Sequence, residues 1–178
     1  IKTNIYGAEN VISASLENNV EKVIALSTDK AANPANLYGA TKLCADKLFV
    51  NANYLSGDRD TKFAVVRYGN VVGSRGSVFQ IFLEQIRKGK QLTVTDPRMT
   101  RFIMSIQDAA GLILKAATIT KGGEIFILKM PSVKIKDLAE SMIEVCGSYV
   151  KPKIKITKSR PDDRIHEYLV TPEEIPYC

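Results

Sequence analysis

Apolar residues follow two different spacings along this chain. Five stretches place them three and four positions apart, which is the spacing of one helix face. The short apolar runs at residues 23–26 and 63–68 contain no alternation, which is typical of strands buried on both faces. The predicted helices cover residues 4–19, 37–53, 78–88, 108–120 and 135–146. The predicted strands and extended segments cover residues 23–26, 63–68, 92–95, 101–106, 124–128, 153–157 and 165–170.

Helices that lead into buried strands indicate an α/β fold with a parallel sheet. We predict the C-terminal part of a Rossmann-type doubly wound parallel sheet, with a small mixed α/β substrate-binding region. Residues 1–90 are expected to form the C-terminal half of the dinucleotide-binding domain, with the catalytic loop and helix. Residues 91–178 are expected to form mainly the substrate-binding region, with some strands and helices returning to the main sheet. No glycine-rich dinucleotide fingerprint follows a strand, so we expect the first βαβ unit to lie upstream of Ile1.

The composition is consistent with this predicted fold, because 45% of the residues are hydrophobic and 25% are charged, as in ordinary globular proteins. No apolar run approaches the ~20 residues needed to cross a bilayer, and no signal-peptide pattern opens the chain, so we expect a cytoplasmic protein. The net charge of +6 suits an anionic ligand such as a nucleotide. Cys44, Cys146 and Cys178 are scattered and His166 is the single histidine, so we expect no disulfide framework and no metal site.

The residues with the clearest chemistry lie between positions 25 and 42. Tyr38 and Lys42 are four apart on a predicted helix and therefore project from one face. An ammonium beside a phenol stabilises the phenolate, so such a tyrosine can take a proton from an alcohol. Asp29 and Lys30 place an acid and a base side by side. Taken alone, this pair would be better interpreted as a surface ion pair of little energetic value.

Two further patterns are weaker. Residues 69–77 are rich in glycine and precede a helix, which lets the backbone approach an anionic ligand but is also common in plain turns. Lys151, Lys153 and Lys155 alternate with isoleucines, which predicts a half-exposed edge strand rather than a phosphate-binding stripe. Because no aromatic residues interleave with these lysines, nucleic-acid binding is not expected.

Six motifs spread over nearly the whole chain point to one family. They are IKTNI at 1–5, STDKAANP at 27–34, NLYGATK at 36–42, VRYGNVVGSRGS at 66–77, MTRF at 99–102 and GGEIF at 122–126. Together they resemble the inverting UDP-N-acetylglucosamine 4,6-dehydratases of the pseudaminic acid pathway, which belong to the extended short-chain dehydrogenase/reductase superfamily and to the polysaccharide biosynthesis protein family. Related membrane-bound and capsule-type dehydratases typically have Met where this chain has Tyr38, so Tyr38 favours the soluble inverting group.

The resemblance implies an NADP-dependent dehydration of UDP-N-acetylglucosamine with inversion at C5, with NAD as the alternative cofactor. Tyr38 would take the proton of the 4-hydroxyl, and Lys42 would hold the nicotinamide ribose. Lys30 would act as the base at C5 and Asp29 as the acid at the 6-hydroxyl, although the two roles could be exchanged. The implied cofactor-binding residues are Tyr38, Lys42, Val71, Val72, Gly73, Ser74 and Arg75. The implied substrate-binding residues are Thr28, Asn70, Val78, Thr95, Arg101 and Arg160.

One departure from the family pattern and two alternative functions accompany this hypothesis. Asp162 and Asp163 follow Arg160 and Pro161 where the family has Gly-Glu, which adds an acid beside the implied diphosphate site. A UDP-hexose 4-epimerase would use Tyr38 without Asp29 and Lys30, and a non-catalytic nucleotide-sugar-binding fragment would bind without turnover. The chain lacks an initiator Met and is expected to be a fragment; we expect the full-length protein to be a homo-oligomer with no nucleic-acid or membrane partner.

Overall fold

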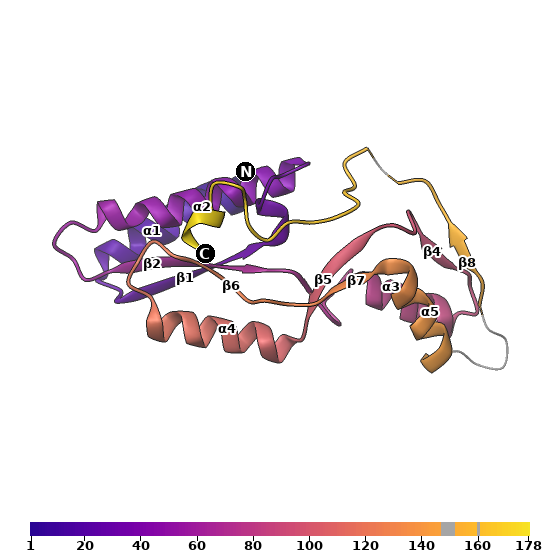
Figure 1. The fold of residues 1–178 in the computed structure, drawn as a ribbon. Coiled ribbons are helices and arrows are strands. Elements are labelled where there is room, and N and C mark those ends of the chain that lie inside the picture. Colours follow the sequence, from indigo (N-terminus) through magenta and orange to yellow (C-terminus); the bar gives the residue numbers. More distant parts are fainter. Residues whose placement is uncertain (147–151, 160) are drawn as a thin grey trace. The chain divides into compact units, whose positions relative to one another are not determined.

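The computed structural model describes residues 1–146, 152–159 and 161–178, which divide into two compact units (Figure 1). Unit 1 contains Ile1–Tyr68, Gln107–Lys129 and Tyr168–Cys178, and unit 2 contains Gly69–Ile106 and Met130–Glu167. Residues 69–90, which the predicted domain division places with residues 1–68, lie in unit 2. Within the described residues, no helix is both long enough and apolar enough to span a membrane.

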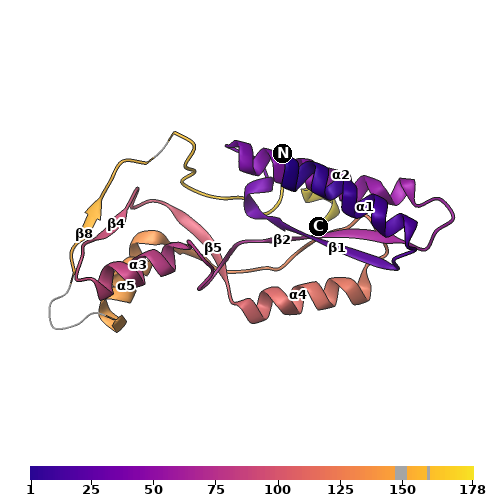
Figure 2. The same ribbon diagram turned by 180° about the vertical axis from the view of Figure 1, so that it is seen from behind.

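Unit 1 is built on a parallel sheet with the strand order β1-β2-β6. These strands are β1 (Lys22–Thr28), β2 (Lys62–Tyr68) and β6 (Ile125–Ile127). The helices α1 (Gly7–Glu17) and α2 (Leu37–Leu55) cover one face, and residues 107–119 of α4 (Ile106–Ile119) cover the other (Figures 1 and 2). This arrangement confirms the predicted α/β fold with a Rossmann-type parallel sheet.

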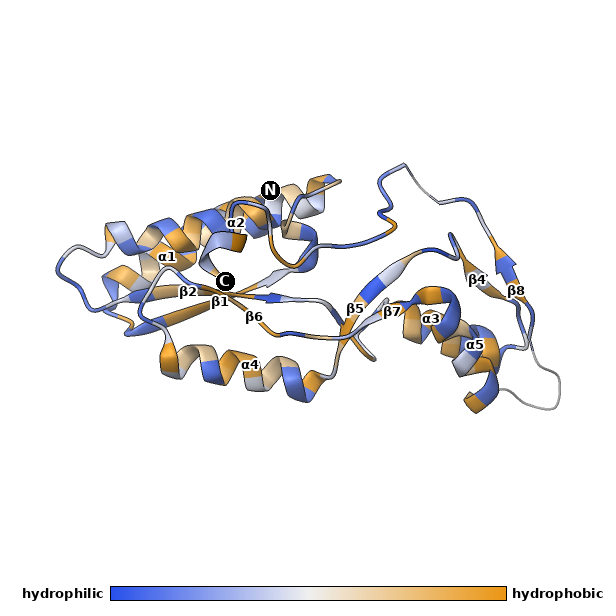
Figure 3. Cartoon of the chain, in the orientation of Figure 1, coloured by the Kyte–Doolittle hydropathy of each residue, from blue (hydrophilic) through white to orange (hydrophobic). Residues whose placement is uncertain are grey.

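The alternation of side chains along β2 explains the two layers of helices. Phe63 and Val65 point to the face where they pack with Phe49 of α2 and Ile12 of α1. Tyr68 has the opposite parity and donates a hydrogen bond from its hydroxyl to the carbonyl of Ala109 in α4, at 3.1 Å. The helices carry both hydrophilic and hydrophobic residues, as expected for helices with one face on a core (Figure 3).

The two predicted buried strands of unit 1 have different outcomes. Residues 63–66 of β2 are fully buried, which confirms the prediction for that strand. The prediction that residues 23–26 are buried on both faces is wrong, because Leu26 is 50% exposed and residues 23–25 are partly exposed. The reason is position: among the described residues β1 pairs with β2 alone and so forms an edge of the sheet.

Unit 2 is a smaller mixed α/β structure. Its strands β3 (Asn70–Val71), β5 (Thr100–Met104) and β7 (Ser132–Lys134) form one sheet, with β3-β5 parallel and β5-β7 antiparallel. A second sheet pairs β4 (Leu92–Val94) with β8 (Ile154–Ile156) in parallel. The core gathers Phe82 and Ile86 of α3 (Val78–Arg87), Leu92 and Val94 of β4, and Ala139, Met142 and Ile143 of α5 (Ile135–Cys146).

Two predictions for the later chain have opposite outcomes. The prediction of an extended segment at 165–170 is wrong, because these residues form bends and irregular chain. Arginine side chains occupy backbone carbonyls that would otherwise pair with a neighbouring strand. Arg101 donates to Ile165 O at 3.2 Å, and Arg67 donates to Leu169 O at 2.7 Å. The edge strand at β8 is confirmed, with Lys153 and Lys155 exposed, while Lys151 lies outside the described residues.

Short irregular helices complete the described fold. A π-helix η1 (Lys2–Tyr6) precedes α1, a single 3-10 turn η2 (Asp29–Ala31) follows β1, and η3 (Ile175–Tyr177) lies near the C-terminus. The turn η2 and the first turn of α2 are in close contact. A Cβ atom added at Gly39 of α2 would lie 2.3 Å from Lys30 O and 2.9 Å from Pro34 Cβ.

We predict that Gly39→Ala lowers the free energy of unfolding by about 1–3 kcal/mol, because the added methyl group must displace backbone. Gly111→Ala is the matched control, since Gly111 lies in α4 and its added Cβ would meet nothing within 4 Å. The control should be more stable by about 0.5–1 kcal/mol, from helix propensity alone. Urea unfolding followed by circular dichroism measures both changes, and equal behaviour of the two variants would contradict the close approach at Gly39.

Candidate active site

The loop between β1 and α2 is held by side chains that cap backbone groups. Thr28 ends β1 and caps η2, and its Oγ1 accepts a hydrogen bond from Lys30 N at 3.4 Å. Asn36 caps α2, with its Oδ1 accepting from Gly39 N at 3.0 Å. Asn33 has a positive φ of 58°, which asparagine tolerates better than most residues. These caps fix the backbone positions from which the side chains of Asp29, Lys30 and Tyr38 extend.

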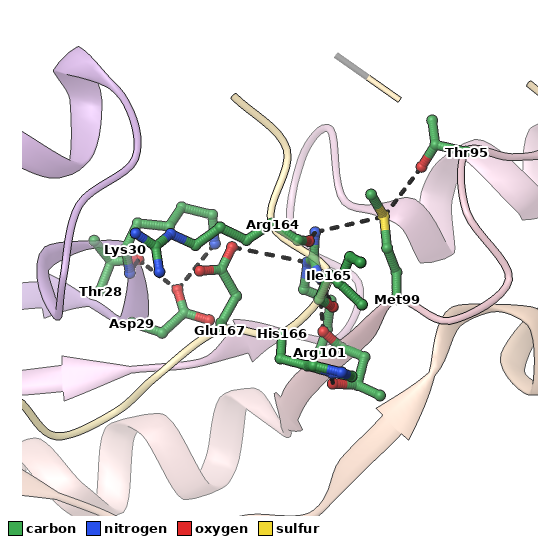
Figure 4. A network of polar contacts seen from close by, with 11 residues as sticks. Thr28, Asp29, Lys30, Thr95, Met99, Arg101, Arg164, Ile165, His166 and Glu167 are labelled. Carbon is green, nitrogen blue, oxygen red and sulfur yellow. Dashed lines mark hydrogen bonds and ion pairs between the residues drawn. The ribbon is translucent and has the colours of Figure 1, made fainter. Parts of the chain in front are cut away.

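Thr28, Asp29 and Lys30 form a compact hydrogen-bonded group (Figure 4). Asp29 is 0% exposed, and its Oδ1 accepts from Thr28 Oγ1 and from Lys30 Nζ, each at 2.9 Å. Its second oxygen, Oδ2, is buried and has no hydrogen-bond partner among the described residues. The Lys30 side chain is 33% exposed, so the pair is not the solvated surface ion pair of the alternative interpretation. A buried carboxylate oxygen without a partner is costly, which favours a functional role.

Tyr38 and Lys42 occupy the first turns of α2. Tyr38 is 52% exposed, and Lys42 Nζ donates to Leu26 O of β1 at 2.5 Å. Burial lowers the pKa of Lys42, and the Asp46 carboxylate one turn further along α2 opposes that shift. A half-exposed phenol and an ammonium tied to the end of a parallel strand are suited to bind hydroxyl groups of a ligand.

The remaining predicted ligand-binding residues that the structure describes belong to unit 2. Asn70 and Val71 form β3, and the Asn70 Oδ1 is buried without a described hydrogen-bond partner. Val72, Gly73, Ser74 and Arg75 are exposed, and Gly73 has a positive φ of 79° that suits glycine. Val78 begins α3.

Thr95 and Arg101 meet at one sulfur atom of unit 2 (Figure 4). Thr95 Oγ1 lies 3.2 Å and Arg101 Nη2 3.8 Å from Met99 Sδ. Arg101 also donates from Nη1 to Thr100 O at 2.7 Å and from Nη2 to Arg164 O at 3.0 Å, so its guanidinium fastens the segment around residue 164. Arg160 lies outside the described residues, so its implied role stays a prediction.

The predicted site residues thus divide between the two units. Unit 1 brings Thr28, Asp29 and Lys30 together and fixes the start of the helix that carries Tyr38 and Lys42. Unit 2 brings Thr95 and Arg101 together, while residues 72–75 form a separate exposed segment after β3. Within the described part of the chain, no group of three or more His, Cys, Asp or Glu could hold a metal ion.

A buried charge cluster beside α2 is absent from the predicted set. Arg67 of β2 is 0% exposed and contacts Asp46 of α2 and Glu174 of the C-terminal segment. Two signals in the sequence point to it: a lone arginine inside an apolar strand, and an aspartate four residues after Lys42. An ionisable residue within a buried strand requires a counter-charge, so the amino-acid sequence alone indicates that such a cluster exists.

Comparison with known proteins adds independent information. The model of the polysaccharide biosynthesis protein family matches residues 1–177. An inverting UDP-N-acetylglucosamine 4,6-dehydratase from Campylobacter jejuni is 51% identical over 98% of this chain and 51% of its own length. A protein from Methanocaldococcus jannaschii, named an uncharacterized membrane protein, is 53% identical over 98% of this chain and 54% of its own length. A UDP-glucose 4-epimerase from Rickettsia akari is 44% identical over 98% of this chain and 51% of its own length.

Solved structures show the same fold. The X-ray structure of Pen from Bacillus thuringiensis has a TM-score of 0.90 and 44% identity, covering 97% of this chain and 54% of its own. The dTDP-glucose 4,6-dehydratase DesIV from Streptomyces venezuelae, with NAD and TYD bound, has a TM-score of 0.82 over 98% of this chain and 59% of its own. At 16% identity, that second likeness shows the fold alone.

The chain spans about half the length of the curated relatives it matches, from 51% to 54%. The family model nevertheless runs from residue 1 to residue 177, and the Campylobacter relative is 51% identical across 98% of the chain. With these matches on the fold described above, the chain belongs to the polysaccharide biosynthesis protein family.

Proposed function

We propose that the intact protein removes water from UDP-N-acetylglucosamine and yields a UDP-4-keto-6-deoxy sugar with inverted C5. The observation that carries this proposal is the buried Asp29 with the Lys30 ammonium on its Oδ1 and no described partner on its Oδ2. The inverting dehydratase from Campylobacter jejuni, at 51% identity, supports it. An oxidation at C4 alone needs only a base for the hydroxyl proton, whereas an elimination needs a second acid and base.

The chemistry assigns each of these side chains a proton. Tyr38 takes the proton of the 4-hydroxyl as C4 becomes a ketone, which makes the C5 proton acidic. Lys30 then removes the C5 proton, and Asp29 protonates the departing 6-hydroxyl, which leaves as water. Return of a proton to the opposite face of C5 inverts that centre. A nicotinamide dinucleotide held by Tyr38 and Lys42 would supply the hydride chemistry of C4 oxidation and C6 reduction, with no net consumption in each turnover.

The hydrogen bond between Lys30 and Asp29 explains how both roles can be filled. The base must be a neutral amine and the acid a protonated carboxyl, yet the pair contains one proton to share. Transfer of that proton along the 2.9 Å contact from Lys30 Nζ to Asp29 Oδ1 converts an ion pair into a neutral base and a neutral acid.

The residues of unit 1 fit a nicotinamide dinucleotide. Lys42 offers an ammonium and Tyr38 a half-exposed phenol, which are donors suited to ribose hydroxyls. We propose NADP as the cofactor, with NAD as the alternative, and loop 71–75 as a second contact. We further propose that the protein is a cytoplasmic homo-oligomer, consistent with the free thiols of Cys44, Cys146 and Cys178.

A UDP-hexose 4-epimerase is the second candidate function, because relatives such as the Rickettsia akari protein carry that name at 44% identity. Both reactions would begin at Tyr38 with oxidation at C4. They differ in the fate of the hydride, since an epimerase returns it to C4 and has no use for an acid and a base at C5 and C6.

The product therefore distinguishes the two functions. We predict that the intact protein converts UDP-N-acetylglucosamine to a species lighter by one water, with a carbonyl at C4. Mass spectrometry and proton NMR of the nucleotide sugar measure both properties, and NMR in deuterated water places deuterium at C5. UDP-N-acetylgalactosamine as the sole product would refute dehydration and support the epimerase.

Replacing the proposed base should separate oxidation from elimination. We predict that Lys30→Ala still reduces the bound cofactor slowly but loses the dehydrated product by about 100- to 10,000-fold, the usual contribution of a general base. Absorbance at 340 nm follows the first step and mass spectrometry follows the product. Lys115→Ala, at an exposed lysine of α4, is the control and should keep full activity. Full dehydratase activity in Lys30→Ala contradicts the assigned role.

Replacing the proposed catalytic phenol should stop both steps. We predict that Tyr38→Phe loses cofactor reduction and product formation together, by about 100- to 10,000-fold, because no group then takes the 4-hydroxyl proton. Tyr54→Phe is the matched control on the same helix, at a side chain that is 86% exposed. Cofactor reduction at the wild-type rate in Tyr38→Phe would show that another group accepts this proton.

A further inference from the structure

The π-helix η1 presents one side chain to the first turns of α2. Asn4 lies within η1, and its Nδ2 donates a hydrogen bond to Oγ1 of Thr41 in α2 at 3.0 Å. The two residues are 37 positions apart in the sequence, and Thr41 is buried, with 6% of its surface exposed. π-helical turns are rare and are frequent at functional sites, and this one contacts the helix that carries Tyr38.

Thr41 connects this contact to the backbone of Tyr38. Its Oγ1 donates to the Tyr38 carbonyl at 2.9 Å, three residues earlier in α2. A threonine hydroxyl has a single proton and two lone pairs, so it can donate to Tyr38 O and still accept from Asn4. The direction of both bonds is thus determined. The backbone of Tyr38 is joined to η1 through one buried hydroxyl group.

The same local bond occurs in α4 without a distant partner. Thr118 Oγ1 donates to Lys115 O at 2.7 Å, again across three residues. Such bonds are an ordinary habit of threonine in helices. Thr118 is exposed, and within the described residues its hydroxyl forms no second hydrogen bond. Thr41 differs because its hydroxyl is buried and is held by a residue of another element, which a local helix bond does not require.

Tyr38 depends on its backbone for its position. Its side chain is 52% exposed, so few neighbours can hold the phenol. On one side, Gly39 N donates to Asn36 Oδ1, and a Cβ added at Gly39 would lie 2.3 Å from Lys30 O. On the other side, Thr41 bonds the Tyr38 carbonyl. The backbone around Tyr38 is therefore held at both neighbouring turns while its phenol remains half exposed.

We propose that Thr41 is a positioning residue for Tyr38, and that its hydroxyl, held by Asn4, fixes the backbone from which the phenol reaches the 4-hydroxyl of the substrate. The inference rests on the proposed function in that Tyr38 is taken to accept this proton. Thr41 and Asn4 touch neither substrate nor cofactor. A displacement of about 1 Å at a reacting group can slow a reaction about 100-fold, so a bond that fixes Tyr38 affects the rate of C4 oxidation.

Removal of the Thr41 hydroxyl tests the proposal. Thr41→Val keeps the branched shape and loses both hydrogen bonds, whereas Thr41→Ser keeps the hydroxyl. The intact protein, loaded with NADP, is mixed with UDP-N-acetylglucosamine in a single turnover. The absorbance of the reduced cofactor gives the rate of C4 oxidation, and its dependence on sugar concentration gives the affinity. We expect Thr41→Val to lose about 10- to 100-fold in rate at unchanged affinity, and Thr41→Ser to recover most of the rate.

Thr118→Val is the matched control, because it removes the equivalent bond in α4 and should keep the wild-type rate. A wild-type rate in Thr41→Val would overturn the proposal. A loss in Thr41→Ser equal to that in Thr41→Val, or weaker sugar binding at an unchanged rate, would overturn it as well, because neither depends on the hydroxyl that holds Tyr38.

Asn4→Ala tests the anchor separately and also serves if Thr41→Val does not fold. It leaves the bond from Thr41 to Tyr38 in place and removes the bond from η1. We expect a loss of about 2- to 10-fold in the same rate, the value of one hydrogen bond. Because Asn4 acts through Thr41, the double variant should be no slower than Thr41→Val alone. Losses that multiply in the double variant would overturn the proposal.

Hydrogen exchange separates this inference from the proposed function. We expect the peptide covering residues 36–44 to exchange faster in Thr41→Val and in Asn4→Ala than in the wild type, and Thr118→Val to leave it unchanged. Unchanged exchange in both variants would overturn the proposal. If the wild type reduces its cofactor but releases no dehydrated product, the dehydratase function fails while Thr41 still positions Tyr38, because C4 oxidation also begins the epimerase reaction.

Discussion

The buried guanidinium of Arg67 is the constraint on which the rest of unit 1 depends. An arginine in the interior is tolerated only when carboxylates and carbonyls meet its donors, since an unpaired buried charge is strongly destabilising. The partners come from two separate parts of the chain: Asp46 lies in α2, and Glu174 and the Leu169 carbonyl lie in the C-terminal segment. Thr171 N adds a bond to Glu174 Oε2 at 2.9 Å, which closes the turn that presents this carboxylate. One side chain therefore joins the sheet, α2 and the C-terminal segment.

Asp29 follows the neighbouring strand β1 and has fewer partners than Glu174. It is as buried as Arg67, whose Nε also lacks a described partner, and only one of its two oxygens is satisfied by described residues. A structural carboxylate would gain from a full set of donors, as Glu174 does. Leaving one oxygen without a partner costs stability that a purely structural role does not return, and the proposed function uses this carboxyl group as an acid.

Some elements of this fold could be predicted from the sequence, and others could not. Strand β2 and helices α2 and α3 follow from hydrophobic spacing, and the loop at 29–30 follows from its motif. The exposed β1 could not be predicted, because an apolar run says nothing about whether a strand has one neighbour or two. The irregular chain at 165–170 could not be predicted either, because its carbonyls bind Arg67 and Arg101, which are far away in sequence. Strands β3 and β7 are too short to leave a periodic pattern.

The two lysines beside the end of β1 are held by different acceptors. Lys30, the proposed base, already donates to the buried Asp29 oxygen at 2.9 Å, so the proposed proton transfer needs no rearrangement of either side chain. Lys42, the residue proposed to bind the ribose, donates instead to the carbonyl of Leu26, which is an acceptor of hydrogen bonds and not a base. The proposed base and the proposed ribose ligand therefore differ in the group to which each ammonium is bound.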